Sequence, residues 1–202
     1  MDYTQGTERF KRERSKKQML WFGIISLCMS FAGLTSAYIV SMERRDWNST
    51  YDFPQALIWS TVIIIISSLT IHLAKKAILS GRKSQGTLFI LITLGLGIAF
   101  VISQIQGYGQ LTAQGLYFTG PVSNITGTFI TLIGVVHAAH VFAGFIALVV
   151  MVIKQFQGKY TKERHLGLSL GVTFWHLLDI LWVFLFLLLY CTRHWCEWTT
   201  CV

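Results

Sequence analysis

The fold of this chain is decided by one stretch of sequence, LSLGVTFWHLLDILWVFLFLLLY, which runs from Leu168 to Tyr190. A helix rises about 1.5 Å per residue, so this stretch is long enough to cross the roughly 30 Å of hydrocarbon in a bilayer. Its only charged residue is Asp179. The stretch therefore predicts a membrane-spanning helix that carries one carboxylate inside the bilayer.

The rest of the chain repeats this pattern. Hydrophobic residues make up 53% of the sequence and charged residues only 13%, whereas a soluble domain carries about 25% charged residues. Both prolines lie between the apolar stretches, where they break no helix. We predict an all-α integral membrane bundle of five transmembrane helices, in which the other four spans are Leu20–Val40, Ala56–Leu73, Thr87–Gln106 and Gly127–Ile153.

We expect one membrane domain, residues 20–192, between two short ends. Residues 1–19 form a basic tail and residues 193–202 a short tail with cysteines. The first span has no convincing signal-peptide cleavage site, so we expect it to remain in the protein. The sequence leaves open the role of the cysteines near the C-terminus, where a disulfide is chemically permitted: Cys191, Cys196 and Cys201.

Lysines and arginines set the expected orientation, because they concentrate on the cytoplasmic side of membrane proteins. They cluster in the N-terminal tail and in the second and fourth connections, whereas the opposite side has only Arg44, Arg45 and Arg193. We therefore expect a cytoplasmic N-terminus and an outside C-terminus. The net charge of +8 is then explained by attraction to anionic lipid and requires no nucleic acid.

Polar groups inside the spans are the candidate functional residues, because burying them in a bilayer costs free energy. Trp175, His176, Asp179 and Trp182 follow helical spacing, so they share one face, where Asp179 can accept a hydrogen bond from the His176 ring or from an indole. We expect a structural network that orients this helix. Proton transfer through Asp179 and contact with a partner subunit are the alternatives.

His137 and His140 form a second pair, three residues apart, in the fourth span. We expect each to stay neutral and to hydrogen-bond a neighbouring helix, because a metal site would need a further ligand from elsewhere. Small residues around them, such as Gly134 and Gly144, favour close helix packing over a cofactor cavity. We therefore predict no metal site.

Two further sets of polar residues remain. His72 and His176 are the only plausible pair for a bis-histidine haem, which makes a small haem-bearing membrane protein a rival reading. Gln104 lies at the end of the third span with Ser103 and Gln106, and we expect these three to satisfy one another, with a substrate site as the alternative.

Read together, the last two spans resemble subunit III of haem–copper respiratory oxidases. The segment GVVHAAHVFAG (Gly134–Gly144) is similar to the family's HGLHV helix, and FWHLLDILW (Phe174–Trp182) is similar to its WHF(V/L)DVVW signature. The spacing between the two segments also agrees. The resemblance extends over roughly residues 18–190, and its five spans match the short form of the family, which lacks the first two helices.

The resemblance implies an accessory subunit without haem, copper or a reaction of its own, in a bacterial cytoplasmic membrane. Haem and copper would lie in partner subunits. Subunit I would be the main partner, beside subunit II and other respiratory subunits. The family stabilises subunit I, binds phospholipid and assists proton uptake. The resemblance places Lys154 and Lys159 where the family contacts lipid phosphate, although both fit equally well as ordinary surface lysines.

Two departures from the family weaken the proton role. Leu27 stands where the family usually has a buried acid, and Gly107 stands where it has a glutamate. Stabilisation of subunit I does not depend on those carboxylates. The electron donor is also open, since a quinol oxidase or a nitric oxide reductase with the same subunit remains a rival to a cytochrome c oxidase.

Overall fold

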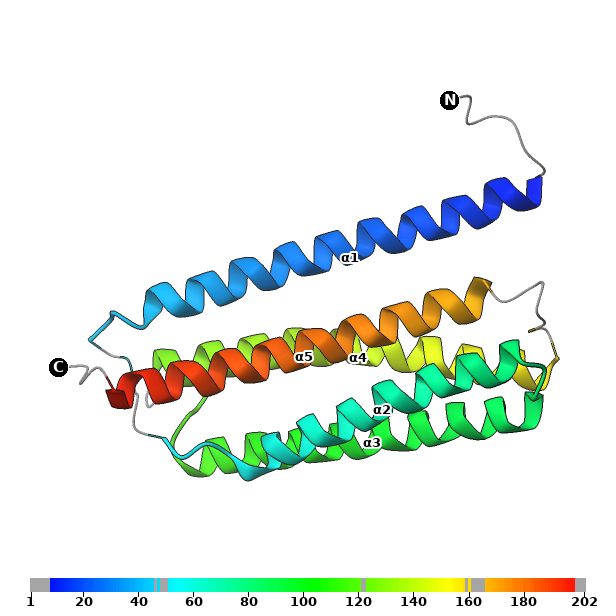
Figure 1. The fold of residues 1–202 in the computed structure, drawn as a ribbon. Helices are drawn as coiled ribbons and strands as arrows, with labels where there is room; N and C mark the ends of the chain where they lie inside the picture. Colours follow the sequence, from blue (N-terminus) through cyan, green and yellow to red (C-terminus); the bar gives the residue numbers. More distant parts are fainter. Residues whose placement is uncertain are drawn as a thin grey trace.

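The protein, described here from a computed structural model, is a bundle of five long helices (Figure 1). The structure describes residues 8–45, 47, 51–120, 123–158, 160 and 166–198, and these contain no strand. All five helices are long and apolar enough to cross a membrane, which confirms the predicted fold. Their bounds are α1 Glu8–Ser41, α2 Gln55–Leu79, α3 Lys83–Ala113, α4 Ile125–Phe156 and α5 Leu166–Trp198.

The first and the last helix of the chain extend well beyond their predicted spans. The helix α1 begins at Glu8, so most of the predicted basic tail is helical and continuous with the first span. The helix α5 runs on to Trp198, inside the predicted C-terminal tail. Neither extension contains glycine or proline, and the lysines, arginines and glutamates of α1 are good helix formers, so nothing in the sequence stops the helix at the membrane surface.

The helices α2 and α3 form a tight antiparallel hairpin along one side of the bundle (Figure 1). Gly81 has a φ of 84° in the connecting turn, a conformation that only glycine adopts at low cost. Behind the turn, Gly86 of α3 meets the Ile78 side chain of α2, in space that a Cβ would fill. The short turn therefore fixes two long helices side by side.

The helix α1 packs less closely than the others. Its second half buries Leu27, Phe31 and Tyr38, whereas Trp21 and Phe22 in its first half are mostly exposed. Figure 1 shows the start of α1 lying apart from the other four helices. Beside the second half of α1, an apolar pocket of about 540 Å³ opens between α1 and α5.

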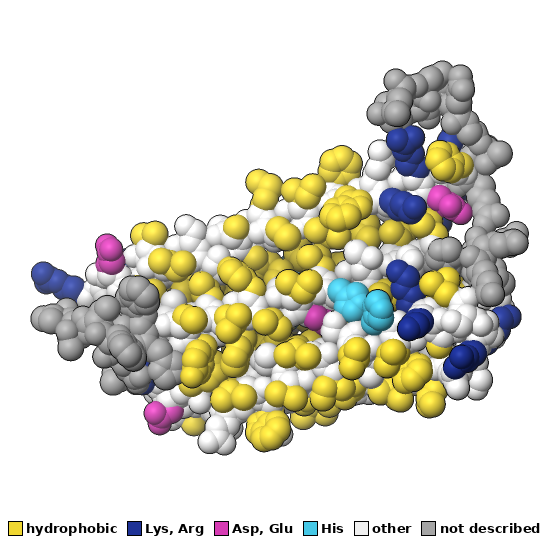
Figure 2. Space-filling view, viewed as in Figure 1, with side chains coloured by type: hydrophobic (Ala, Val, Ile, Leu, Met, Phe, Trp, Pro, Cys, Tyr) yellow, Lys and Arg dark blue, Asp and Glu magenta, His cyan; other side chains and the backbone are white. Residues whose placement is uncertain are grey.

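The surface of the bundle has the pattern of a membrane protein. Hydrophobic side chains cover the middle of the face drawn in Figure 2, and lysines and arginines gather mainly at one end. We call this end the basic end; it holds the start of α1, the α2–α3 turn and the end of α4, with Lys17, Lys76, Lys83 and Lys154.

Candidate functional site

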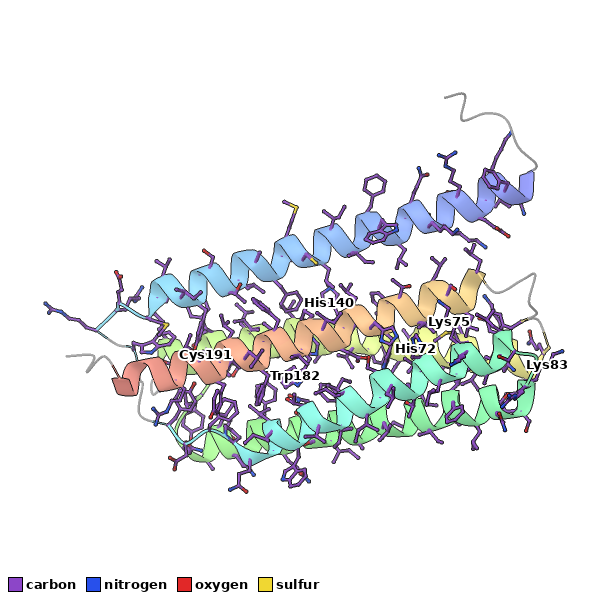
Figure 3. The ribbon with its side chains drawn as sticks, in the orientation of Figure 1. His72, Lys75, Lys83, His140, Trp182 and Cys191 are labelled. Carbon is purple, nitrogen blue, oxygen red and sulfur yellow. The ribbon has the colours of Figure 1, made fainter. Side chains whose placement is uncertain are left out.

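The polar face predicted for α5 points into the bundle, toward α2. Trp175, Asp179 and Trp182 are buried, at 2%, 4% and 5% exposure, and His176 is half-buried at their edge. Figure 3 shows Trp182 near the middle of the bundle, among the side chains between α5 and α2. The predicted grouping on one helix face is what the structure contains.

Both indoles bind hydroxyl groups of α2. Trp175 donates from Nε1 to the Ser67 hydroxyl oxygen at 3.0 Å, and Trp182 donates from Nε1 to the Thr61 hydroxyl oxygen at 3.1 Å. Neither indole therefore donates to Asp179, although an indole is one of the two donors that the sequence leaves open for this carboxylate. Because α5 faces a helix rich in hydroxyl groups, each indole finds a partner on α2 rather than on its own helix.

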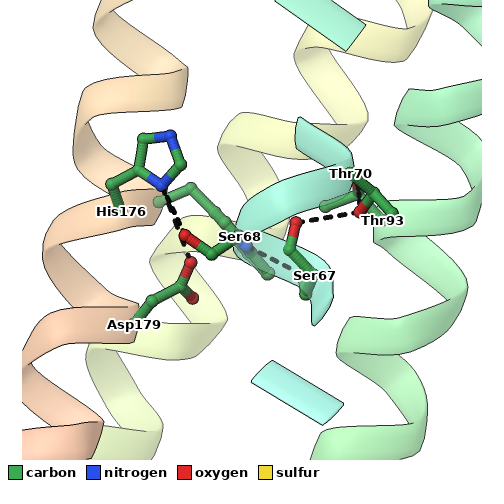
Figure 4. Close-up of polar contacts among 7 residues, drawn as sticks. Ser67, Ser68, Thr70, Thr93, His176 and Asp179 are labelled. Atoms are coloured by element: carbon green, nitrogen blue, oxygen red, sulfur yellow. Dashed lines mark hydrogen bonds and ion pairs between the residues drawn. The ribbon is translucent and has the colours of Figure 1, made fainter. Parts of the chain in front are cut away.

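The carboxylate of Asp179 lies one turn along α5 from His176, and Ser68 of α2 lies beside both residues (Figure 4). The Nδ1 atom of His176 is 2.7 Å from the Ser68 hydroxyl oxygen and 3.9 Å from the nearer carboxylate oxygen of Asp179. The second distance is too long for a hydrogen bond. Neither oxygen of Asp179 has a hydrogen-bond partner among the described residues, so this buried group is poorly compensated and its ionisation is costly.

The two histidines of α4 differ from the expected arrangement. His140 places Nδ1 2.7 Å from the Val136 carbonyl oxygen of its own helix. His137 is 3% exposed, and neither of its ring nitrogens has a partner in the described part of the chain. Its ring centroid lies 5.2 Å from that of Trp182, with Phe31 and Phe100 edge-on. Aromatic packing, rather than a hydrogen bond to another helix, surrounds His137.

Gln104 and Ser103 bind α2 instead of each other. The Gln104 amide donates to the Ser60 hydroxyl oxygen at 2.7 Å, and the Ser103 hydroxyl donates to the Ala56 carbonyl oxygen at 2.8 Å. The expectation that the polar residues at the end of α3 satisfy one another is thus wrong for these two. It overlooked α2 as the shared partner, although Ser60, Thr61, Ser67 and Ser68 recur there at a spacing of seven residues.

Small residues on α4 allow the close packing that the sequence predicts. A Cβ on Gly134 would overlap the hydroxyl of Tyr108 from α3, and one on Gly144 would lie 2.7 Å from Leu178 of α5. A second apolar pocket, of about 570 Å³, opens between α3 and α4 beside Tyr108 and His137. Gly134 and Gly144 therefore let α4 approach two neighbours at once.

The residues proposed for cofactors and lipid lie near the basic end. The rings of His72 and His176 are neighbours, with centroids 6.2 Å apart. No group of three or more metal-binding side chains occurs in the part of the chain that the structure describes. Lys154 is exposed in the last turn of α4, whereas Lys159, Cys196 and Cys201 fall outside the residues whose side chains are described.

Comparison with known proteins decides the family. The family model for cytochrome c oxidase subunit III matches residues 51–196, which is most of the chain and all of α2 to α4. The chain belongs to the cytochrome c oxidase subunit III family. The match includes the WHLLD segment, and with it the face of α5 that binds α2.

Relatives in the family serve complexes with different names. Subunit 3 of the cytochrome bo(3) ubiquinol oxidase of Pseudomonas aeruginosa is 29% identical over 175 residues, covering 84% of this chain and 81% of the relative. Cytochrome c oxidase subunit 3 of Corynebacterium diphtheriae is 28% identical over 169 residues, covering 80% of each. Cytochrome c oxidase subunit 3 of Glycine max is 31% identical over 131 residues, and the match covers 65% of this chain and 47% of that relative.

Leu27 and Gly107, where the resemblance implies a carboxylate, both lie in packed positions. Leu27 is buried on α1, and a Cβ on Gly107 would lie 2.9 Å from the Leu57 side chain of α2. A carboxylate at either position would enter an apolar contact. The structure thus uses these positions for helix packing.

Proposed function

We propose that this chain is a non-catalytic accessory subunit, subunit III, of a haem–copper terminal oxidase. Membership of the subunit III family over residues 51–196 carries the proposal, and relatives named as subunit 3 of oxidases support it. In this proposal haem and copper are held by partner subunits, mainly subunit I, with subunit II and further respiratory subunits beside it. The complex reduces oxygen and moves protons across a bacterial cytoplasmic membrane, with the N-terminus of this chain inside.

The proposed contribution of the chain is mechanical support of subunit I. The hydrogen bonds from Trp175, Trp182 and Gln104 fix α5 and α3 to α2. Such bonds are favourable in a bilayer because no water competes for the same groups. A bundle held in this way is rigid, and its contact with the catalytic subunit stabilises the fold of that subunit during turnover.

Phospholipid is the proposed ligand. The apolar pockets of about 540 and 570 Å³ suit acyl chains, and their exposed linings include Ile39 and Ile102. Lys154 is exposed at the basic end, where it can meet a lipid phosphate as a point charge. We extend this role to Lys159 from the resemblance alone.

A quinol oxidase is the second candidate complex, and the Pseudomonas aeruginosa relative favours it, because its name is that of a ubiquinol oxidase subunit and the match covers 84% of this chain. Cytochrome c oxidase names among the other relatives favour the first candidate. Oxygen consumption by the purified complex with reduced cytochrome c and, separately, with a quinol distinguishes the two.

The supporting role is tested by turnover. The oxidase is purified from cells with and without this chain, and oxygen consumption is followed over many catalytic cycles at equal haem content. We expect equal initial rates and a several-fold shorter active lifetime without the chain. Equal lifetimes would contradict the stabilising role, and an initial rate near zero without the chain would contradict its being non-catalytic.

A further inference from the structure

One exposed stripe of α2 differs from the other outward surfaces of the bundle. Its apolar members recur three or four residues apart, which places them on one side of the helix. A histidine interrupts this series, one turn before an exposed lysine. In chain order the exposed stripe is Ile58, Val62, Ile65, Leu69, His72 and Lys76.

The interrupting residue, His72, belongs to a polar cluster that spans α2 and α5. Its ring lies 6.2 Å from that of His176, and His176 in turn contacts Ser68 and faces Asp179. Figure 2 shows histidine side chains gathered on a face that is otherwise largely hydrophobic, with an acidic side chain beside them. A polar patch thus opens outward from the buried carboxylate.

The outward nitrogens of this patch lack partners. No hydrogen bond to the His72 ring or to Nε2 of His176 occurs among the described residues. Two exposed hydroxyl groups of the spans are, by contrast, satisfied by their own helix, since Ser30 donates to the Ser26 carbonyl oxygen and Thr173 donates to that of Ser169. In hydrocarbon an unpaired polar group is costly, so His72 and His176 require a partner outside this chain.

The depth of the patch favours a protein over a lipid headgroup. His72 lies seven residues before the end of α2, about 10 Å along the helix axis at about 1.5 Å per residue. His176 lies ten residues into α5, beginning at Leu166, or about 15 Å by the same measure. Lys75 and Lys76 stand nearer the basic end and meet a phosphate first. A group that reaches both imidazoles must therefore come from within the bilayer.

The cluster also indicates which chemistry the partner offers. If His176 carries its proton on Nδ1, that N–H points to Ser68 and Asp179, and Nε2 presents a lone pair outward. This lone pair favours a partner that offers a hydrogen-bond donor.

We propose that the outward face of α2 and α5 around His72 and His176 is the docking surface for a transmembrane helix of the catalytic subunit, which supplies a hydrogen-bond donor to the imidazoles. This inference rests on the proposed function and adds the contact face. The aliphatic residues of the stripe pack against the partner helix, and the histidines set its register. A polar contact in an apolar helix interface fixes alignment in this way.

The contact face is tested by photo-crosslinking in the intact complex. Benzoylphenylalanine replaces Leu69 in the stripe or, as the matched control, Phe142 on α4, whose exposed fraction of 68% is close to the 61% of Leu69. The complex is purified through this chain, irradiated, and analysed by mass spectrometry. We expect the Leu69 position to form adducts with the haem-bearing subunit and the Phe142 position to form adducts mainly with lipid.

Three results would overturn the inference. Adducts of the Leu69 position with lipid alone would identify the surface as a lipid face. Equal yields of subunit adducts from both positions would remove its specificity. Failure of any haem-bearing subunit to co-purify with the unsubstituted chain would remove the proposed function and the contact face with it, whereas co-purification without Leu69 adducts would remove the contact face alone.

A second variant separates hydrogen bonding from contact. His72 is exposed, so His72→Leu leaves the core of the bundle intact. We expect about threefold weaker retention of the haem-bearing subunit in a detergent titration, which corresponds to about 0.6 kcal/mol, an average membrane hydrogen bond. Retention equal to or stronger than that of the unsubstituted chain would contradict a polar contact at His72.

Discussion

Two tryptophans of α5 each donate one hydrogen bond to α2, and these bonds hold α5 against that helix. The indoles of Trp175 and Trp182 lie seven residues apart on α5 and reach hydroxyl groups six residues apart on α2. This match fixes the rotation of α5 about its axis as well as its height. Asp179 and His176 lie between the two indoles on the same face of α5.

Removing one indole bond should weaken the bundle. We expect Trp182→Phe to lower the free energy of unfolding in mild detergent by about 1 to 2 kcal/mol, because it removes the bond that the Thr61 hydroxyl oxygen accepts and trims a packed ring. The Thr61 hydroxyl keeps only its own bond to the Leu57 carbonyl oxygen. Trp59→Phe is the matched control, since Trp59 is 66% exposed. Equal losses in the two variants, measured by denaturant titration, would contradict a specific role for the Trp182 bond.

Ionisation of Tyr160 should make the stability of the bundle fall at alkaline pH. It lies between α4 and α5, buried at 5% exposure, and burial raises the pKa of its hydroxyl. The folded chain therefore holds this proton more tightly than the unfolded chain, whose tyrosines titrate near 10. The resulting stability is full below that pH and is lost as pH rises through the raised pKa.

The corresponding measurement compares the unsubstituted chain with Tyr160→Phe by thermal unfolding between about pH 8 and 11. We expect the unsubstituted chain to lose more stability over the upper half of this range, since the phenylalanine has no proton to lose. Parallel curves for the two proteins would show that the Tyr160 hydroxyl is not held in its neutral form by the fold.

At the scale of helices, the number and type of elements follow directly from the sequence, and the helix partners do not. Long apolar runs with few charges specify membrane-spanning helices regardless of their neighbours, so all five spans were predictable. The partner of a polar residue depends on which helix face lies opposite. That is why Trp175 and Trp182 were placed in the right group, while their acceptors, Ser67 and Thr61, were missed.

The histidines of α4 show the same limit. Spacing alone predicts that His137 and His140 lie close together, but aromatic packing around His137 depends on α1, α3 and α5 converging there. Close approach at Gly134 and Gly144 was predictable, because small residues in a membrane helix allow it whatever the partner. The small residues of α4 thus predicted that other helices approach closely. Which side chains lie opposite them is shown only by the arrangement of the helices.

The close contact between α3 and α4 depends on the glycine at position 134, which has no side chain. We expect Gly134→Ala to destabilise the bundle by about 1 to 3 kcal/mol, the usual cost of overpacking, because the added carbon overlaps the Tyr108 hydroxyl. Gly95→Ala is the control, since a Cβ there meets nothing within 4 Å. The thermal unfolding temperature in detergent should fall for the first variant and stay equal or rise for the second. A fall for both would point to a general effect of replacing glycine.

At the scale of the whole molecule, charge placement predicts how the bundle sits in the membrane. Lysines and arginines gather at the basic end, which the proposed function places in the cytoplasm. In a cysteine-free variant, we expect a thiol introduced by Ser80→Cys in the α2–α3 turn to react with a membrane-impermeant maleimide only in inside-out vesicles. The thiol from Gln114→Cys, after α3, should react only in right-side-out vesicles. The reverse pattern would invert the orientation.

The measurement that tests the central claim most directly is purification of the tagged chain in mild detergent, with mass spectrometry and a visible spectrum of the eluate. A subunit of a haem–copper oxidase should carry with it a large haem-bearing partner, and the chain isolated from that partner should show no Soret absorbance. If the chain eluted alone and showed Soret absorbance of its own, with His72 and His176 required for it, the account would be contradicted. The chain would then be a haem protein rather than an accessory subunit.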